Sequence, residues 1–243
     1  MLLGLDVGGT FTDAVIIDGH RVVATAKRRT TKDNLMNGIG EALDAVLEGY
    51  DTSNIEQVTL STTVVTNTIV EAKEQVVDLY VITGPGRNVD DIFPVEPIYL
   101  QGYTDHRGIV VERTPADAVR GIANMVQARS GTDLAAVSAK FGVRNPQEEL
   151  SITEELKNTY HTISNGSLLS GSLNFPRRTI SAYFNSAVTP VFTVFKKNVE
   201  DALSARNILA PLHILKADGG SLPMEHMVSR PVETAFTGPA ATV

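Results

Sequence analysis

The sequence predicts an α/β protein with a mixed sheet, and two features of the chain support this. Short apolar runs bounded by turn residues alternate with segments whose apolar residues recur at helical spacing, a pattern typical of α/β proteins. The first three apolar runs are closely spaced, which predicts an antiparallel meander that leads into a helix. The predicted strands are LLGLDVG (2–8), DAVIID (13–18), RVVATA (21–26), QVTLSTT (57–63), VVDLYVIT (76–83), LAAVSAKFG (134–142) and LHILKADGG (212–220).

Four segments between these strands have helical spacing. The first has Asp33 or Asn34 available as its N-cap, and the next two begin with a proline, which favours the first turn of a helix. The longest contains Pro190, which is expected to kink or split it. These helices are predicted over residues 34–49, 114–131, 145–159 and about 178–207.

The predicted organisation has three parts. Residues 83–108 are rich in Pro and Gly and lack periodicity, so they are a candidate boundary or active-site loop, in which the acidic pair Asp90-Asp91 is expected to be solvated. We expect a first α/β unit over 1–83 and a second over 84–174. Residues 175–243 are expected to supply a long helix and a strand that return to the first unit.

Composition excludes several classes of protein and site. The chain has 243 residues, 42% of them hydrophobic, which is enough for a sizeable core. The net charge of −7 argues against a nucleic-acid or anionic-membrane partner, and the lack of cysteine excludes disulfides and thiolate metal sites. Without a basic leader or an apolar run of about 18 residues, the chain is expected to be soluble and cytoplasmic.

The segment DVGGTFTD (6–13) interrupts the first two strands and predicts a phosphate clamp. Gly8 and Gly9 allow a tight turn whose backbone N–H groups can approach an anion closely, because no Cβ obstructs them. Thr10 and Thr12 add hydroxyl donors. Neither the lysine of a Walker A loop nor the glycine spacing of a Rossmann turn is present.

The carboxylate of Asp6 suggests a metal, and Asp13 is a candidate cofactor-binding residue. Asp6, at the end of the first strand, can hold Mg²⁺ or its waters, which neutralise phosphate charge, and Asp13 closes the motif. A Gly-Gly hairpin with threonines chosen for β-propensity is the alternative. It leaves Asp6 and the hydroxyl groups unexplained, so the clamp is favoured.

Polar residues also follow a later strand. Thr62, Thr63, Thr66 and Asn67 lie where a strand gives way to a helix, so their polar groups could face substrate or nucleotide. An ordinary N-cap cluster explains them equally well, and the two interpretations stay open.

Two further groups of residues show weaker evidence of a functional role. Asp218, followed by Gly219 and Gly220, ends a predicted strand and could bind metal or act as a base; an Asx-type turn is the alternative. Arg177-Arg178 could meet an anion, but a solvated helix start is favoured. The five histidines are scattered and show no metal-binding spacing.

Five segments in order resemble the hydantoinase A/5-oxoprolinase family, within the actin, sugar-kinase and heat-shock-chaperone ATPase superfamily. LDVGGTFTDAV resembles the superfamily's first phosphate motif, and the DGG match favours a functional Asp218. In place of the family's ERTST element the chain has FPRRTIS (175–181), a departure from the pattern. The other matching segments are LSTTVVTNTIVEAK (60–73), FGVRNPQEEL (141–150), LKADGGSLP (215–223) and RPVETAFTGPAATV (230–243).

The resemblance implies a ribonuclease-H-like (actin-like ATPase) first lobe, with ATP and Mg²⁺ as cofactors. It also implies ATP-dependent opening of a cyclic amide such as 5-oxoproline or a hydantoin. A second hydantoinase-type subunit or oligomer is compatible with it. The family's second phosphate motif is absent before Val243, so we expect the chain to be the N-terminal part of a longer enzyme and to be inactive alone. A small-molecule kinase, a non-catalytic assembly module and a ketone carboxylase subunit are the alternatives.

Overall fold

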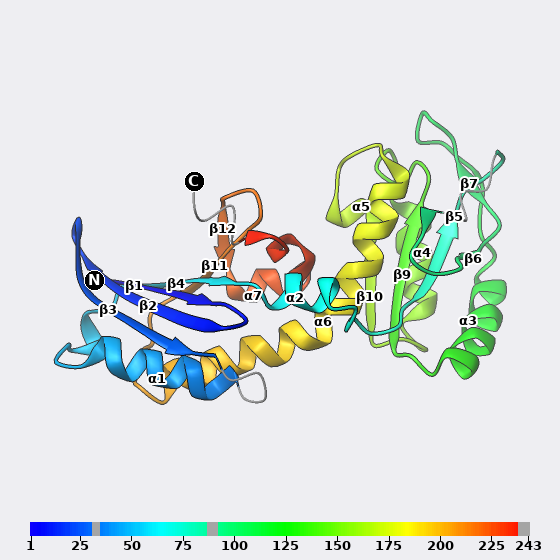
Figure 1. Cartoon of the computed structure of the whole chain (residues 1–243). Helices are drawn as coiled ribbons and strands as arrows, with labels where there is room; N and C mark the ends of the chain where they lie inside the picture. Colours follow the sequence, from blue (N-terminus) through cyan, green and yellow to red (C-terminus); the bar gives the residue numbers. More distant parts are fainter. Residues whose placement is uncertain (31–34, 87–91, 238–243) are drawn as a thin grey trace. The chain divides into compact units, whose positions relative to one another are not determined.

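The structure, a computed structural model, describes residues 1–30, 35–86 and 92–237. The chain divides into two units (Figure 1). Unit 1 comprises residues 1–73 and 189–243, and unit 2 comprises residues 74–188.

Unit 1 contains a six-stranded mixed sheet with the strand order β12-β11-β4-β1-β2-β3. The first three strands form the expected antiparallel meander, β4 and β11 run parallel to β1, and β12 closes an antiparallel hairpin with β11. This is the ribonuclease-H-like arrangement, so the predicted fold class is confirmed. The strands are β1 (Leu2–Val7), β2 (Phe11–Asp18), β3 (Arg21–Arg29), β4 (Gln57–Thr62), β11 (Leu212–Leu215) and β12 (Ser221–Pro223).

One face of this sheet is covered by helices. Alternate residues of β1, such as Leu5 and Val7, are buried, whereas Asp6 between them is exposed, because successive side chains of a strand point to opposite faces. Helix α1 (Leu35–Leu47) contacts β2 and β3 and buries Ile39 and Leu43 completely. Unit 1 also contains residues 189–204 of the long helix α6 (Phe175–Ser204). Its remaining elements are short: α2 (Val64–Val70), α7 (Met224–Met227) and the 3₁₀ turns Thr52–Asn54 and Pro231–Thr234.

Unit 2 contains a parallel four-stranded sheet with the order β10-β9-β5-β6. All five residues of β5 and all six of β9 are buried, as expected for a parallel sheet that is covered on both faces. One core joins the sheet to α3 and α4, and the other joins it to the first half of α6. The elements are β5 (Asp78–Ile82), β6 (Ile98–Tyr99), β9 (Leu134–Ala139), β10 (Thr162–Asn165), α3 (Ala116–Ser130), α4 (Gln147–Leu156), α5 (Gly166–Leu169), α6 (Phe175–Ser204) and a separate hairpin of β7 (Tyr103–Thr104) and β8 (Val110–Glu112).

Several details differ from the expectations. The units divide after residues 73 and 188 rather than 83 and 174, because β5 pairs with β9 and β6 and so lies in unit 2. Helix α6 continues through Pro190, so the proline does not split it. The N-cap candidates Asp33 and Asn34 and the pair Asp90-Asp91 lie outside the described residues.

Candidate functional site

The turn between β1 and β2 is the centre of the candidate site. The Gly8 N–H donates to the Phe11 carbonyl at 3.0 Å and closes the turn. The Val7 carbonyl accepts from the Thr63 N–H at 3.2 Å, which ties the end of β1 to the junction of β4 and α2. The expected turn between two antiparallel strands is therefore confirmed, and no helix crosses it.

Gly9 lies against Asn67 of α2. A Cβ atom at Gly9 would be 2.8 Å from Asn67 Nδ2, closer than real side chains approach. Asn67 Nδ2 is itself held, because it donates to Thr63 Oγ1 at 3.1 Å. Neither Gly8 nor Gly9 has a positive φ, so Gly9 is required by this close approach and not by backbone conformation.

Two adjoining hollows border the turn, both lined by Gly8, Gly9, Thr63 and Asn67. One has a volume of about 210 Å³ and reaches Thr68, Lys73 and Val191; the other, of about 450 Å³, reaches Thr10 and Phe11. The structure thus brings together both glycines and Thr10 with Thr63 and Asn67, which are distant in sequence.

Lys73 supplies a positive charge to the smaller hollow and was not among the predicted site residues. It forms an ion pair with Glu71, which itself lines both hollows; the Lys73 side chain is 67% exposed and that of Glu71 44%. The sequence signal was weak, since the lysine ends the segment LSTTVVTNTIVEAK without a glycine-rich motif around it. Its position lets an ammonium group approach an anion at the turn.

Asp6 opens onto a different hollow. The register places Ser61, Asp6, Asp13 and Lys27 in a row across β4, β1, β2 and β3. All four line a cavity of about 440 Å³ that does not include Gly8 or Gly9. The residues of the predicted clamp are therefore divided between this cavity and the two hollows at the turn.

Asp6 and Asp13 lie directly opposite each other on β1 and β2, where two carboxylates repel each other. Only Asp13 has a basic side chain among the described residues as its partner. Lys27 Nζ is 3.0 Å from both oxygens of Asp13. Asp6 is exposed and has no hydrogen bond or ion pair to the described part of the chain. An unpaired carboxylate beside a second carboxylate suits a cation.

Thr12 lines none of these three cavities. Its side chain is completely buried, and its hydroxyl shares a hydrogen bond of 3.0 Å with Thr30 Oγ1. The expectation of a ligand donor at Thr12 is corrected on this ground, because the pleat of β2 turns this residue into the interior.

Asp218 stabilises the hairpin between β11 and β12. Its Oδ1 accepts from the Gly220 N–H at 3.0 Å, and its Oδ2 is 2.8 Å from Lys216 Nζ. Gly219 has φ of +82°, a left-handed conformation that favours glycine. The Lys216 ammonium and the Gly220 N–H hold the pKa of Asp218 below its ordinary value, so this carboxylate is a poor base. The geometry favours the Asx-type turn, and these three residues line neither hollow at the β1–β2 turn.

Arg178 is buried, contrary to the expected solvated helix start. Its guanidinium donates to the carbonyls of Ser172 and Ala139 at 2.6 and 2.8 Å. Glu149, also fully buried, accepts from the Ala139 N–H at 2.7 Å and from Ser167. Burial raises the pKa of Glu149 and lowers that of Arg178, while their opposite charges counter both shifts. Arg177 is exposed as predicted.

Family profiles cover most of the chain. Residues 2–160 match the hydantoinase/oxoprolinase N-terminal region, and residues 178–243 match hydantoinase/oxoprolinase. The chain belongs to the hydantoinase/oxoprolinase family. Comparison with the sequences of curated proteins gave no match.

Two solved structures share the fold of this hydantoinase/oxoprolinase chain. An ATP-dependent caprolactamase from Pseudomonas jessenii matches with a TM-score of 0.82 and 19% identity, and nucleotide-free acetone carboxylase with 0.79 and 16%. Each match covers 99% of this chain and 39% of the other. The chain thus spans well under half the length of these proteins. In the described residues, no helix is long and apolar enough to cross a membrane.

Proposed function

We propose that this chain is the N-terminal part of an enzyme that couples ATP hydrolysis to opening of a cyclic amide of the hydantoin or 5-oxoproline type. The observation that carries the proposal is the hollow at the β1–β2 turn, which Gly9 and Lys73 both line, with Asp6 in a separate cavity next to the turn. Family membership supports it. A cytoplasmic location and a second subunit of the same family belong to this proposal.

The turn is suited to nucleotide phosphates. The absence of a side chain at Gly9 leaves backbone groups approachable, and Thr63 and Asn67 present polar atoms to the same hollow. Lys73 can offset phosphate charge once its exposed pair with Glu71 opens, which costs little at the surface.

Asp6 is the residue that would hold Mg²⁺. The described residues contain no group of three or more His, Cys, Asp or Glu side chains that could hold a metal. Proteins often bind Mg²⁺ through one or two carboxylates while phosphate oxygens and water complete the shell, so Asp6 could anchor the ion. The ion would neutralise phosphate charge.

The proposed chemistry activates a stable amide. Transfer of the γ-phosphoryl group to the amide oxygen weakens amide resonance and makes the carbon electrophilic. Water adds to this carbon, and the C–N bond breaks, which releases the amine and leaves an acyl phosphate. A second water then hydrolyses the acyl phosphate to a carboxylate and inorganic phosphate. Phosphoryl transfer asks of the protein mainly positioning and charge neutralisation, which the turn, Lys73 and Asp6 supply on the nucleotide side.

Carboxylation of a ketone is the second candidate. It is favoured by the match to acetone carboxylase, whose TM-score of 0.79 is close to that of the caprolactamase, 0.82. Both reactions share ATP activation of a carbonyl oxygen, so both require the turn to bind the nucleotide phosphates. Assays with bicarbonate plus a ketone and with cyclic amides distinguish the two.

Asp6→Asn in the full-length protein tests the site. We expect Mg²⁺-dependent ATP hydrolysis and turnover to fall about 100-fold or more, because Asn keeps the shape and loses the charge. The melting temperature should not fall, since the change also removes the repulsion between Asp6 and Asp13. Asp18→Asn is the matched control, since Asp18 is an exposed carboxylate at the far end of β2. Near-normal rates for Asp6→Asn at saturating Mg²⁺ and ATP would show that the turn is only a hairpin.

A further inference from the structure

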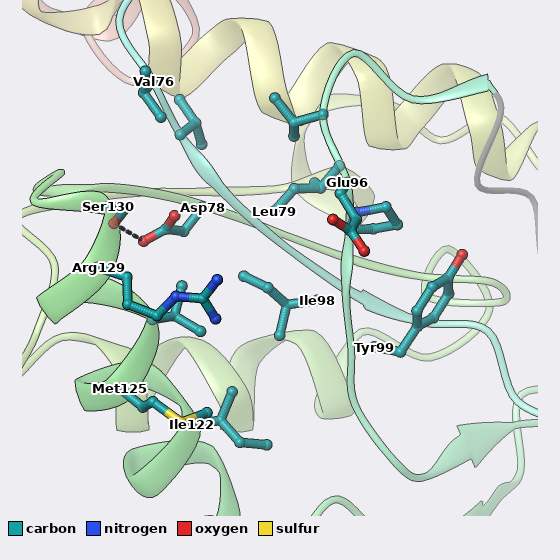
Figure 2. A pocket seen from close by; sticks show the side chains of 14 residues that line it. Val76, Asp78, Leu79, Glu96, Ile98, Tyr99, Ile122, Met125, Arg129 and Ser130 are labelled. Atoms are coloured by element: carbon teal, nitrogen blue, oxygen red, sulfur yellow. Dashed lines mark hydrogen bonds between the residues drawn. The ribbon is translucent and has the colours of Figure 1, made fainter.

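A hollow in unit 2 has the features of a small-molecule site and lies outside the site described above. It is bounded by the beginnings of β5 and β6 and by the last turns of α3 (Figure 2). Its volume is about 660 Å³, within the range of roughly 300–1,000 Å³ typical of ligand pockets.

The walls of this hollow are largely aliphatic. Ile98 of β6 and Ile122 of α3 are half-buried, and Met125 of α3 is 59% exposed. Figure 2 shows the three side chains grouped on one side of the hollow. A branched aliphatic group placed there would remove apolar surface from water.

Two opposite charges face this hollow without being paired. Figure 2 shows the Arg129 guanidinium and the Glu96 carboxylate both directed into it, from α3 and from the segment before β6. Neither forms a hydrogen bond or ion pair through its side chain with any described residue, including the other. Each can therefore bind a group of opposite charge on a ligand.

A second carboxylate lies at the wall of the hollow. Asp78 is only 7% exposed, and its Oδ2 accepts from Ser130 Oγ at 2.7 Å and from the Tyr160 hydroxyl at 2.8 Å. Both donors are neutral, and in the described part of the chain Asp78 has no ion pair. A buried carboxylate with only neutral partners is stabilised by a cation that comes within reach.

We propose that this hollow binds a zwitterionic aliphatic amino acid. The ligand carboxylate contacts Arg129, its ammonium group contacts Glu96, and its side chain packs against Ile98, Ile122 and Met125. A simple anion would meet two carboxylates, and a simple cation would meet Arg129, so a ligand that carries both charges suits the hollow best. This site is independent of the nucleotide site, and either can fail without the other.

Isothermal titration of the 243-residue chain with three matched probes tests the ligand class. L-leucine carries both charges, 3-methylbutylamine lacks the carboxylate, and 4-methylpentanoate lacks the ammonium group. We expect saturable binding of leucine and at least about tenfold weaker binding of each analogue, since each loses one charge-assisted contact. Equal binding of either analogue, or no leucine binding up to about 50 mM, overturns the assignment.

Three variants locate the binding in this hollow. Arg129→Met and Glu96→Gln keep much of the side-chain shape, and each should weaken leucine binding at least about tenfold. Arg120→Met is the control, because Arg120 lies on the same helix and pairs with Glu155 outside the hollow. Circular dichroism melts verify folding. Unchanged leucine affinity in Arg129→Met and Glu96→Gln would refute the proposal. It would also be refuted if the chain self-associated with rising concentration, did not bind leucine, and lost the self-association in these two variants.

Discussion

Gly9 illustrates how one missing side chain shapes the candidate site. The nearest atom to an added Cβ is Asn67 Nδ2, which the hydrogen bond to Thr63 restrains. The glycine therefore permits the turn to pack on α2 while its backbone stays open to the hollow. The same contact makes the residue testable through stability as well as activity.

Gly9→Ala should destabilise the protein by about 1–2 kcal/mol, because the methyl group overlaps the Asn67 amide. Asn67→Ala removes the overlapping atom, so the double variant should lose at least about 0.5 kcal/mol less than the sum of the single variants. Chemical denaturation measures all three. Gly121→Ala is the control: a Cβ there meets open space, and the change should stabilise α3 by about 0.5–1 kcal/mol. If the stability losses of Gly9→Ala and Asn67→Ala were strictly additive in the double variant, the close approach of Gly9 to Asn67 would be contradicted.

Neighbouring arginines provide a second residue-level prediction. Arg178→Ala should cost about 3–5 kcal/mol, because it leaves the Ala139 and Ser172 carbonyls without this donor and removes the positive charge that counters buried Glu149. Arg177→Ala should change stability by no more than about 0.5 kcal/mol, since this side chain is exposed. Equal unfolding midpoints for the two variants would exclude the buried role of Arg178.

At the scale of elements, the residues at the end of β11 stabilise the β11–β12 hairpin. Its turn combines the left-handed Gly219 with the Asp218 carboxylate bound to the Gly220 N–H. Lys216 bridges this turn to the segment that follows α7 through a 3.7 Å contact with Glu233. A low carboxylate pKa follows from these partners.

The hairpin should respond to acid in a defined direction. The folded pKa of Asp218 lies below 3.8, so its contribution to stability is present above the unfolded value and is lost as the pH falls through the folded pKa. Lys216→Met should shift the Asp218 pKa back toward 3.8, which a carboxyl NMR titration from pH 2 to 6 measures in both proteins. An Asp218 pKa at or above 3.8 in the unmodified chain would contradict the turn's electrostatics.

Helix α6 shows that a tertiary setting can override a local breaker. Pro190 removes one backbone donor from the helix interior, yet the helix runs from Phe175 to Ser204. Its first half buries Ala182, Tyr183 and Ala187 in one core of unit 2. Packing of this kind stabilises a helix more than local propensity does.

At the scale of the whole molecule, the chain covers 39% of each of two proteins that share its fold. We expect the 243-residue chain to bind ATP weakly and to show no measurable turnover of 5-oxoproline or hydantoins. Positioning and charge neutralisation for phosphoryl transfer need groups beyond those of this turn. Titration with ATP and a coupled phosphate assay check both points. Robust hydrolysis of ATP and of the cyclic amide by this chain would refute the proposal that it carries only part of the nucleotide site.

The sequence by itself determined seven of the strands, the four long helices and the turn at Gly8 and Gly9, because strand alternation, helical periodicity and turn chemistry are local properties. It did not predict the short strands β6, β7, β8, β10 and β12. Only the tertiary structure showed that Thr12 points inward, that Arg178 is buried and that Lys73 reaches the turn. It also placed Asp6 and the glycines in separate cavities. The reason is physical: the face, burial and partners of a side chain depend on strand pairing and packing between residues far apart in the sequence, which no local pattern encodes.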